Sequence, residues 1–115
     1  MKQNKYHAQK CKINGSVYDS KKEAQRYQVL TLLQKSGQIC DLERQRKYIL
    51  IPTQRDENGK LIERELSYVA DFVYKENGNE VVEDVKGYKE GAAYRIFAIK
   101  RKLMLSVHGI RVREV

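Results

Sequence analysis

The sequence predicts a mixed α/β domain, in which a central sheet with a three-stranded antiparallel meander is flanked by two helices. Asn-Gly pairs, the strongest short signal for a two-residue hairpin turn, occur three times between segments that can be extended. Two longer segments instead repeat apolar residues at helical spacing. With 115 residues the chain can bury one modest core. We therefore expect one domain over residues 1–115, made of an N-terminal hairpin extension at 1–19 and a core at 20–115.

The hairpins follow from the Asn-Gly pairs, because both central positions of such a turn need a positive φ. The pairs are Asn14-Gly15, Asn58-Gly59 and Asn77-Gly78. The first predicts a small hairpin over residues 11–18. The second and third flank one shared strand, "LSYVADFVY", so residues from about 46 to 87 are expected to form the three-stranded meander. Pro52 marks a bend or an edge position in its first strand.

Two helices are expected, one before and one after the meander. The segment "SKKEAQRYQVLTLLQKSG" offers Ser20 as N-cap, Glu23 three residues later and Gly37 as the stop. The segment "AAYRIFAIKRKLMLSVHG" ends at Gly109 and repeats apolar residues at helical spacing, at Ile96, Ile99, Leu103 and Val107. The last residues, "IRVREV", alternate and predict a closing strand.

Charge is distributed unevenly along the chain. The net charge is +8, with +7 in residues 1–50 (11 Lys+Arg, 4 Asp+Glu) and +1 in residues 51–115 (12 Lys+Arg, 11 Asp+Glu). The basic half would attract the phosphates of a nucleic acid, so we expect a nucleic acid as the partner. The plain alternative is a protein that is basic for solubility alone.

Other classes of function are disfavoured by what the sequence lacks. No apolar run approaches a membrane span and the N-terminus has no apolar signal-peptide stretch, so we expect a cytoplasmic protein without a membrane partner. The cysteines and histidines, two of each, have the wrong spacing for a structural zinc site. Neither a Gly-rich phosphate loop nor a G-x-S-x-G elbow occurs.

The stretch "VVEDVKG" at residues 81–87 has the valines of a buried strand but also carries charge. With the third Asn-Gly pair as the turn, positions whose numbers sum to 155 face each other, which sets Asp71 opposite Asp84. Since side chains alternate along a strand, Asp71, Asp84 and Lys86 are expected on one face of the sheet.

Two facing aspartates destabilise a sheet, because their Cβ atoms lie about 5 Å apart. One of them could take up a proton, Lys86 could bridge them as an ordinary ion-pair cluster, or a divalent cation could bind between them. Mg²⁺ is typically held by one or two carboxylates, waters and substrate phosphate oxygens. A cation there would also make phosphodiester chemistry available, with Lys86 orienting a water or steadying developing negative charge.

Together these residues resemble the PD-(D/E)XK, or restriction-endonuclease-like, nucleases, and in particular small phage and prophage members. The patterns "KY", "DSKKEAQRY", "YVADFVY" and "VVEDVKG" carry the resemblance, which covers the chain from about residue 20 to its end. The resemblance implies an α-β-β-β-α-β core and a Mg²⁺ site, with Mn²⁺ as a second option. Asp71 would be the first ligand, Asp84 and Lys86 would form the D-x-K, and Glu23 would be the helix glutamate.

The resemblance implies a Mg²⁺-dependent endodeoxyribonuclease that hydrolyses phosphodiester bonds. A chain this small contacts little DNA, which favours a structure-specific enzyme that acts as a homodimer on branched DNA, as Holliday-junction resolvases do. Ala70 replaces the proline that gives the family's motif its first letter. Because that proline is not a ligand, its loss makes the match to the motif poorer but leaves the expected metal ligands unchanged. The alternative function is a non-catalytic nucleic-acid-binding module on a nuclease-like fold.

Glu23 has a second interpretation. Ser20-x-x-Glu23 is also a capping box, in which the glutamate would bend back to the backbone N–H of Ser20. Against pure capping, Glu23 forms one row along the helix with Tyr27, Leu30 and Gln34, and this row is expected to lean toward the sheet. The sequence leaves both interpretations open.

Basic and aromatic residues near these motifs are candidates for DNA contact. Two follow "VVEDVKG" directly, and others lie at the start of the first helix and along the second. The expected contacts are Lys21, Lys22, Tyr88, Lys89, Arg95, Lys100, Arg101 and Lys102. Lys100 follows the apolar row closely enough that we expect it to point toward the carboxylates. A solvated helix face is the alternative for the second helix.

Overall fold

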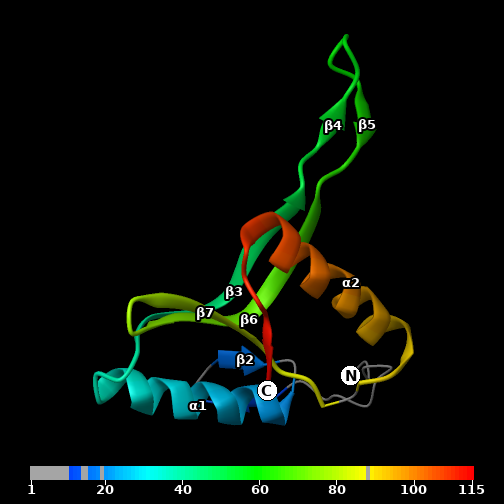
Figure 1. Cartoon of the computed structure of the whole chain (residues 1–115). Coiled ribbons are helices and arrows are strands. Elements are labelled where there is room, and N and C mark those ends of the chain that lie inside the picture. The colour runs from blue at the N-terminus through cyan, green and yellow to red at the C-terminus, as the bar shows by residue number, and fades with distance from the viewer. Residues whose placement is uncertain (1–10, 14–15, 19, 88) are drawn as a thin grey trace.

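The computed structural model describes residues 11–13, 16–18, 20–87 and 89–115, and it confirms the mixed α/β class (Figure 1). In chain order the elements are β1 (Cys11–Ile13), β2 (Ser16–Tyr18), α1 (Lys21–Lys35), β3 (Cys40–Ile51), β4 (Gln54–Arg55), β5 (Leu61–Glu63), β6 (Leu66–Glu76), β7 (Asn79–Asp84), α2 (Gly91–His108) and β8 (Arg113–Glu114). Within this described part, neither helix combines the length and the apolar content that a membrane crossing needs.

The central sheet has the strand order β3-β6-β7-β8. The strands β3, β6 and β7 pair antiparallel, which confirms the predicted meander, although its first strand begins at Cys40 rather than near residue 46. The closing strand β8 is confirmed as well, and it pairs in parallel with β7. Two separate hairpins, β1–β2 and β4–β5, complete the strands.

The Asn-Gly turns differ from one another in backbone conformation. Asn77 (φ 53°) and Gly78 (φ 80°) are both left-handed, as predicted for a two-residue turn. Between β4 and β5 only Gly59 is left-handed, so the expectation of a positive φ at both positions was wrong there. Asp56 explains the difference, because its carboxylate accepts a hydrogen bond from Asn58 N at 2.9 Å and its carbonyl accepts one from Gly59 N at 3.0 Å. The first pair, at 14–15, lies outside the described residues.

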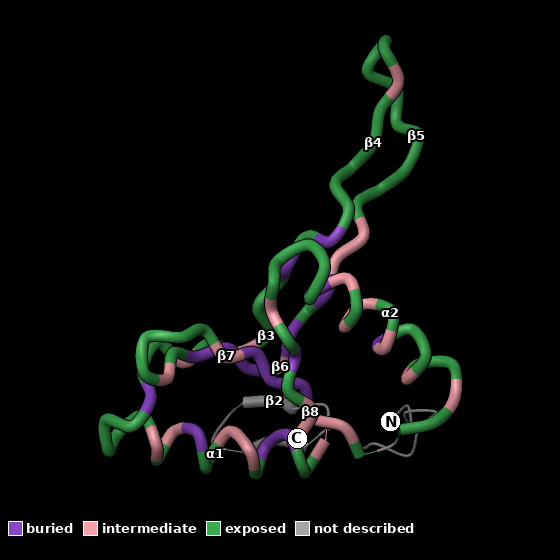
Figure 2. The backbone as a smooth tube through the Cα atoms, in the orientation of Figure 1, coloured by how far each residue is buried: buried purple, intermediate pink, exposed green. Residues whose placement is uncertain are grey.

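The β4–β5 hairpin forms an arm that stands away from the rest of the molecule (Figure 1). Pro52 follows the end of β3 at the base of this arm, which agrees with the bend expected there. Figure 2 shows the arm exposed along nearly its whole length, and Ile62 on β5 is 60% exposed. The buried core therefore lies between the sheet and the helices, away from the arm.

The two helices pack with different core clusters. Leu30 of α1 packs with Ile39, Phe72 and Tyr74, whereas Phe97 and Met104 of α2 pack with Tyr48, Leu50, Tyr68 and Ala70. The apolar row that predicted the second helix is not its buried face, because Ile96 is 55% exposed and Ile99 is 57% exposed. Phe97 is the buried residue in place of these isoleucines, and its ring packs against Tyr68. An aromatic side chain buries more apolar area than an aliphatic one.

At Asp71 the strand β6 switches the face on which its even-numbered side chains are buried. Ala70 packs in the cluster with α2 and Phe72 in the cluster with α1, although strict alternation would place both on one face. On β3, Gln45 lies between the residues that pair with Phe72 and Ala70, and it has a left-handed φ of 55°. Asp71 therefore lies where the sheet passes from one helix to the other.

Removing the N-cap of α1 is expected to lower the free energy of unfolding by about 1 kcal/mol. Ser20 Oγ accepts a hydrogen bond from Glu23 N at 3.1 Å, and alanine would leave this N–H without its acceptor. Urea unfolding of Ser20→Ala measures the loss. Ser106→Ala, an exposed serine inside α2, is the control. Equal losses in the two variants would contradict the capping role.

Candidate active site

Glu83, the first acid of "VVEDVKG", is fully buried on the side of the sheet that faces α1. Arg26 of α1 donates from Nε to Glu83 Oε1 at 2.8 Å and from Nη2 to Oε2 at 2.7 Å. The hydroxyl of Tyr74 donates to the same carboxylate. Glu83 therefore ties α1 to the sheet and has no access to a substrate.

Asp84, the second acid, is 5% exposed and lies on the side of α2. Its Oδ2 accepts a hydrogen bond from Tyr68 Oη at 2.5 Å, and its Oδ1 lies 2.8 Å from Lys86 Nζ. Burial and the charge of Asp84 raise the pKa of Tyr68, so its hydroxyl remains a donor. Lys86 Nζ also lies 3.9 Å from the centre of the Phe97 ring. Of the ion-pair cluster that the sequence offered as an alternative, the pair of Lys86 with Asp84 is thus present.

Asp71 lies at the point where β6 changes faces. Its Oδ2 accepts a hydrogen bond from Val85 N at 2.8 Å. Burial, and then the charge of Asp84, raise the pKa of Asp71 to about 7; the Val85 bond lowers it, and the charge of Glu23 raises it further. Repulsion between the two aspartates is therefore one cause of the raised pKa.

The register that predicted this repulsion holds along the β6–β7 hairpin, where Phe72↔Glu83 and Val73↔Val82 pair as expected. The ladder stops one residue short of Asp71 and Asp84. At Asp84 the strand β7 no longer pairs with β6. It pairs there with β8, where Glu114 lies opposite Asp84. Asp84 thus gains a strand partner on its other side, while the Val85 backbone reaches the Asp71 side chain.

Glu23 is 3% exposed, and its backbone and side chain have separate tasks. The backbone N–H donates to Ser20 Oγ, which confirms half of the capping box. The carboxylate accepts a hydrogen bond from Gln45 Nε2 at 3.1 Å and lies 3.9 Å from Arg44 Nη2. Gln45 Nε2 also lies 3.4 Å from Asp71 Oδ1, so it links the helix glutamate to the strand aspartate. Gln45 was not among the predicted site residues, because no local pattern gives a glutamine a left-handed backbone.

The predicted DNA-binding residues are placed very differently from one another. Lys22 Nζ donates to the carbonyl of Lys86 at 2.8 Å and thus lies next to the acids. Arg101 pairs with Glu114 at 3.2 Å, so its charge is partly offset. Lys100 is half-buried on α2, and Tyr88 lies outside the described residues. The exposed members of the set are Lys21, Lys22, Lys89, Arg95 and Lys102.

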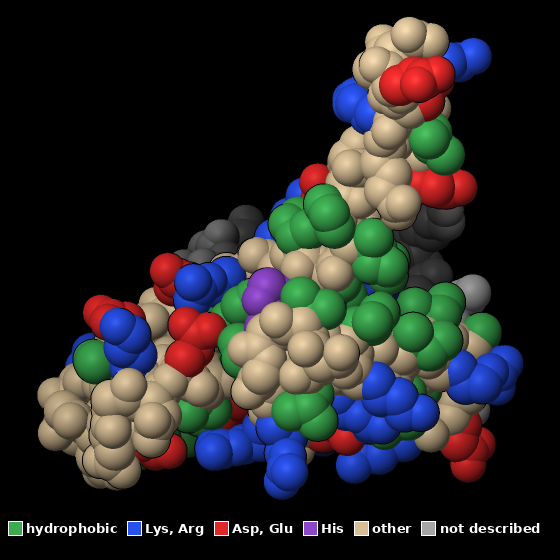
Figure 3. Space-filling view, turned by 45° about the horizontal axis from the view of Figure 1, so that its top comes forward, with side chains coloured by type: hydrophobic (Ala, Val, Ile, Leu, Met, Phe, Trp, Pro, Cys, Tyr) green, Lys and Arg blue, Asp and Glu red, His purple; other side chains and the backbone are tan. Residues whose placement is uncertain are grey.

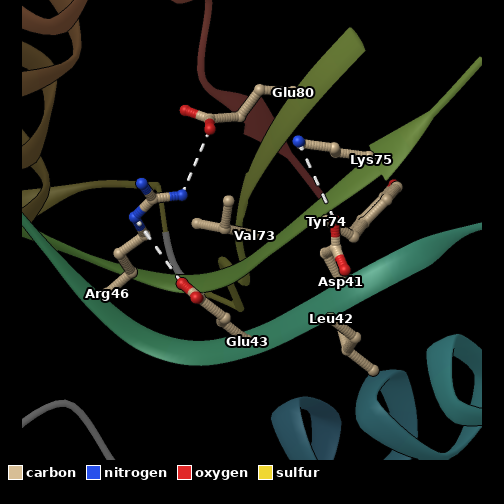
Figure 4. A pocket seen from close by; sticks show the side chains of 8 residues that line it. All are labelled: Asp41, Leu42, Glu43, Arg46, Val73, Tyr74, Lys75 and Glu80. Carbon is tan, nitrogen blue, oxygen red and sulfur yellow. Dashed lines mark hydrogen bonds and ion pairs between the residues drawn. The ribbon is translucent and has the colours of Figure 1, made fainter. Parts of the chain in front are cut away.

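A shallow hollow of about 480 Å³ lies on the sheet away from these acids (Figure 4). It is lined by Asp41, Leu42, Glu43, Arg46, Val73, Tyr74, Lys75 and Glu80. Its charges pair with one another: Arg46 lies 3.1 Å from Glu80 and 3.6 Å from Glu43, and Lys75 lies 3.8 Å from Asp41. None of the predicted catalytic residues lines it, so the hollow is not the candidate site.

The donor atoms around Asp71 are carboxylate oxygens, which suit a hard cation such as Mg²⁺. Asp71 with Asp84 or Glu23 would supply the one or two carboxylates that Mg²⁺ usually takes from a protein. In the part of the chain that the structure describes, no three or more His, Cys, Asp or Glu side chains form a group that could hold a metal. A cation at Asp71 would therefore have to take most of its ligands from water and phosphate.

Comparison with known proteins gives one match. A family model described as "Protein of unknown function (DUF1064)" matches residues 3–112. No curated protein and no solved structure matches the chain. The family match covers nearly the whole chain, and the function has to be argued from the side chains.

Proposed function

We propose that the chain, which belongs to the DUF1064 family, is a metal-dependent DNA endonuclease that hydrolyses phosphodiester bonds. The observation that carries the proposal is the position of Asp71, which Gln45 Nε2 links to Glu23 and which bonds the backbone of Val85, the residue after Asp84. Negative charge gathered at a half-buried position is unfavourable, and a bound cation would offset it. The resemblance of the sequence to PD-(D/E)XK nucleases points to the same three acids and to Lys86.

In this proposal Asp71 and Asp84 hold Mg²⁺, or Mn²⁺ in its place, and Glu23 assists directly or through a water. When bound, the cation would polarise the scissile phosphate and lower the pKa of a water. Tyr68 fixes the orientation of Asp84 through its 2.5 Å hydrogen bond, and Lys86 is held 2.8 Å from the same carboxylate. Lys86 is thereby placed to orient the attacking water and to offset negative charge on the phosphate.

The DNA backbone would bind the exposed basic side chains around the acids. Among them, Lys22 bonds to the Lys86 carbonyl, and Lys21 precedes it on α1. Figure 3 shows Lys and Arg side chains along the edge of the visible face that lies farthest from the arm. Their contacts with phosphates give affinity without sequence preference.

We place this activity in the cytoplasm, that of a bacterial host if the gene is carried by a phage. The small contact surface favours a homodimer that cuts branched DNA over an enzyme that reads a long sequence. Sedimentation of the protein alone and with a four-way junction tests the dimer.

Cleavage of branched, single-stranded and duplex DNA, with and without Mg²⁺, tests the proposed activity. We expect Mg²⁺-dependent cleavage that falls about 100-fold in Asp84→Asn, because the amide keeps an acceptor for Tyr68 but removes the charge that would hold the cation. Glu76→Gln, a carboxylate at the far end of β6, is the matched control and should cleave like the unmodified chain.

Two outcomes would contradict the endonuclease. Cleavage that is equal in Asp84→Asn and the unmodified chain would remove the proposed site. Tight DNA binding without cleavage in any divalent ion would instead favour the alternative, a nucleic-acid-binding module on a nuclease-like fold.

A further inference from the structure

Gln45 has an unusual backbone for its residue type. Among the described residues, the non-glycine residues with a positive φ are Asp41 (56°), Gln45 (55°) and Asn77 (53°). Asn77 lies in a tight turn, and Asn and Asp adopt this region more readily than other residues because their short side chains can bond locally. Gln45 is an exposed glutamine in the middle of a strand, so its conformation needs another cause.

The left-handed residue redirects the side chain of Gln45. A local irregularity in a strand re-aims a side chain, and such irregularities often lie beside active sites. Here the neighbours of Gln45 on β3 pair with residues on either side of Asp71 on β6. The amide Nε2 consequently lies 3.1 Å from Glu23 Oε1 and 3.4 Å from Asp71 Oδ1.

One amide group thus contacts two carboxylates that come from different elements, Glu23 from α1 and Asp71 from β6. Ionised carboxylates are acceptors only, so both favour the two N–H donors of Nε2. Like charges would otherwise move apart. The amide opposes this separation without adding a charge of its own, which a lysine or arginine would add and which would compete with a cation.

We infer that Gln45 is a positioning residue, which keeps the carboxylates of Glu23 and Asp71 together so that one cation can use both. This role rests on the proposed function. It predicts that the cost of the left-handed backbone and the contribution of the amide appear in different measurements. Glycine at residue 45 removes the strain and the amide together, so stability and cation binding should change in different directions.

The test compares Gln45→Gly with Asp41→Gly, which places glycine at another left-handed position of β3, where the side chain pairs with Lys75 at 3.8 Å and not with the acids. Thermal unfolding, calorimetric binding of Mn²⁺ and DNA cleavage are measured for both. We expect both variants to melt at or above the temperature of the unmodified chain. Only Gln45→Gly should bind Mn²⁺ about tenfold more weakly, and its kcat should fall while its KM for DNA stays unchanged.

Unchanged Mn²⁺ affinity and kcat in Gln45→Gly would overturn the positioning role while leaving the endonuclease intact. If that variant fails to fold, Gln45→Met decides instead, since it keeps the length of the side chain and lacks the amide; the same loss supports the role and wild-type binding overturns it. An unmodified chain that binds no Mn²⁺ would overturn both this role and the proposed function.

Discussion

Glu83→Ala is expected to lower the free energy of unfolding by about 4 kcal/mol. The Glu83 side chain is fully buried, and the substitution leaves the guanidinium of Arg26, itself only 28% exposed, without its carboxylate. Removing one partner of such a pair is costly, because the remaining charge stays in a poorly solvated place. Small domains are stable by about 5–15 kcal/mol, so this variant would lose much of its stability.

Glu80→Ala is a matched control for this prediction. Glu80 lies on the same strand and also has an arginine and a tyrosine as partners, with Arg46 at 3.1 Å and Tyr48 at 2.9 Å, but it is exposed. Solvent can replace its contacts, so we expect a loss below about 1 kcal/mol. Urea unfolding of both variants measures the difference. Equal losses would show that burial does not decide the strength of the Glu83 pair.

For Glu83 and Asp84 the sequence predicts the strand register but not the partners of their side chains. The third Asn-Gly turn predicted the register of β6 with β7, and the structure confirms it, because hairpin pairing depends on a few neighbouring residues. The same register placed Glu83 and Asp84 on opposite sides of a strand. That Arg26 meets Glu83 depends on how α1 lies on the sheet, which no local pattern encodes.

The second helix shows a different limit. Its extent and its end at Gly109 were predictable from spacing and from the glycine stop, and Gly109 is left-handed as expected. Its buried face was not, because α2 carries two overlapping apolar rows and the sequence does not say which one meets the sheet. Phe97 and Met104 are buried, while Ile96 and Ile99 remain exposed.

The candidate site was predictable only in part for a related reason. The contact of Asp84 with Lys86 follows from a short strand and the Glu23 backbone follows from a helix cap, whereas the ladder expected to pair Asp71 with Asp84 stops one residue earlier. Gln45 does not follow from a local pattern, because it reaches Glu23 and Asp71 only where the sheet changes the helix that it packs against. Strict alternation along a strand, on which the sequence prediction depended, cannot anticipate such a change.

The protein is expected to lose stability as the pH rises from about 4 to about 7. Burial and the charge of Asp84 raise the pKa of Asp71 from 3.8 to about 7 in the folded chain. Between these values the folded state binds a proton that the unfolded state has released, so the free energy of unfolding falls as the pH rises. A shift of this size corresponds to about 4 kcal/mol, and the contact of Asp71 with solvent reduces the expected loss to about 3 kcal/mol.

Asp71→Asn should abolish this loss, because asparagine keeps an acceptor for Val85 N and cannot ionise. The variant is therefore expected to match the unmodified chain near pH 4 and to exceed its stability at pH 8, whereas Asp41→Asn, at an exposed position, should change little. Urea unfolding at the two pH values measures both.

Mg²⁺ should stabilise the unmodified chain at pH 8 and not at pH 5, where Asp71 carries a proton. If Asp71→Asn is instead less stable than the unmodified chain at pH 8, the charge of Asp71 does not oppose folding. If it is more stable and no longer cleaves DNA, the chain keeps an acid that weakens the fold, and a ligand role at this position explains why.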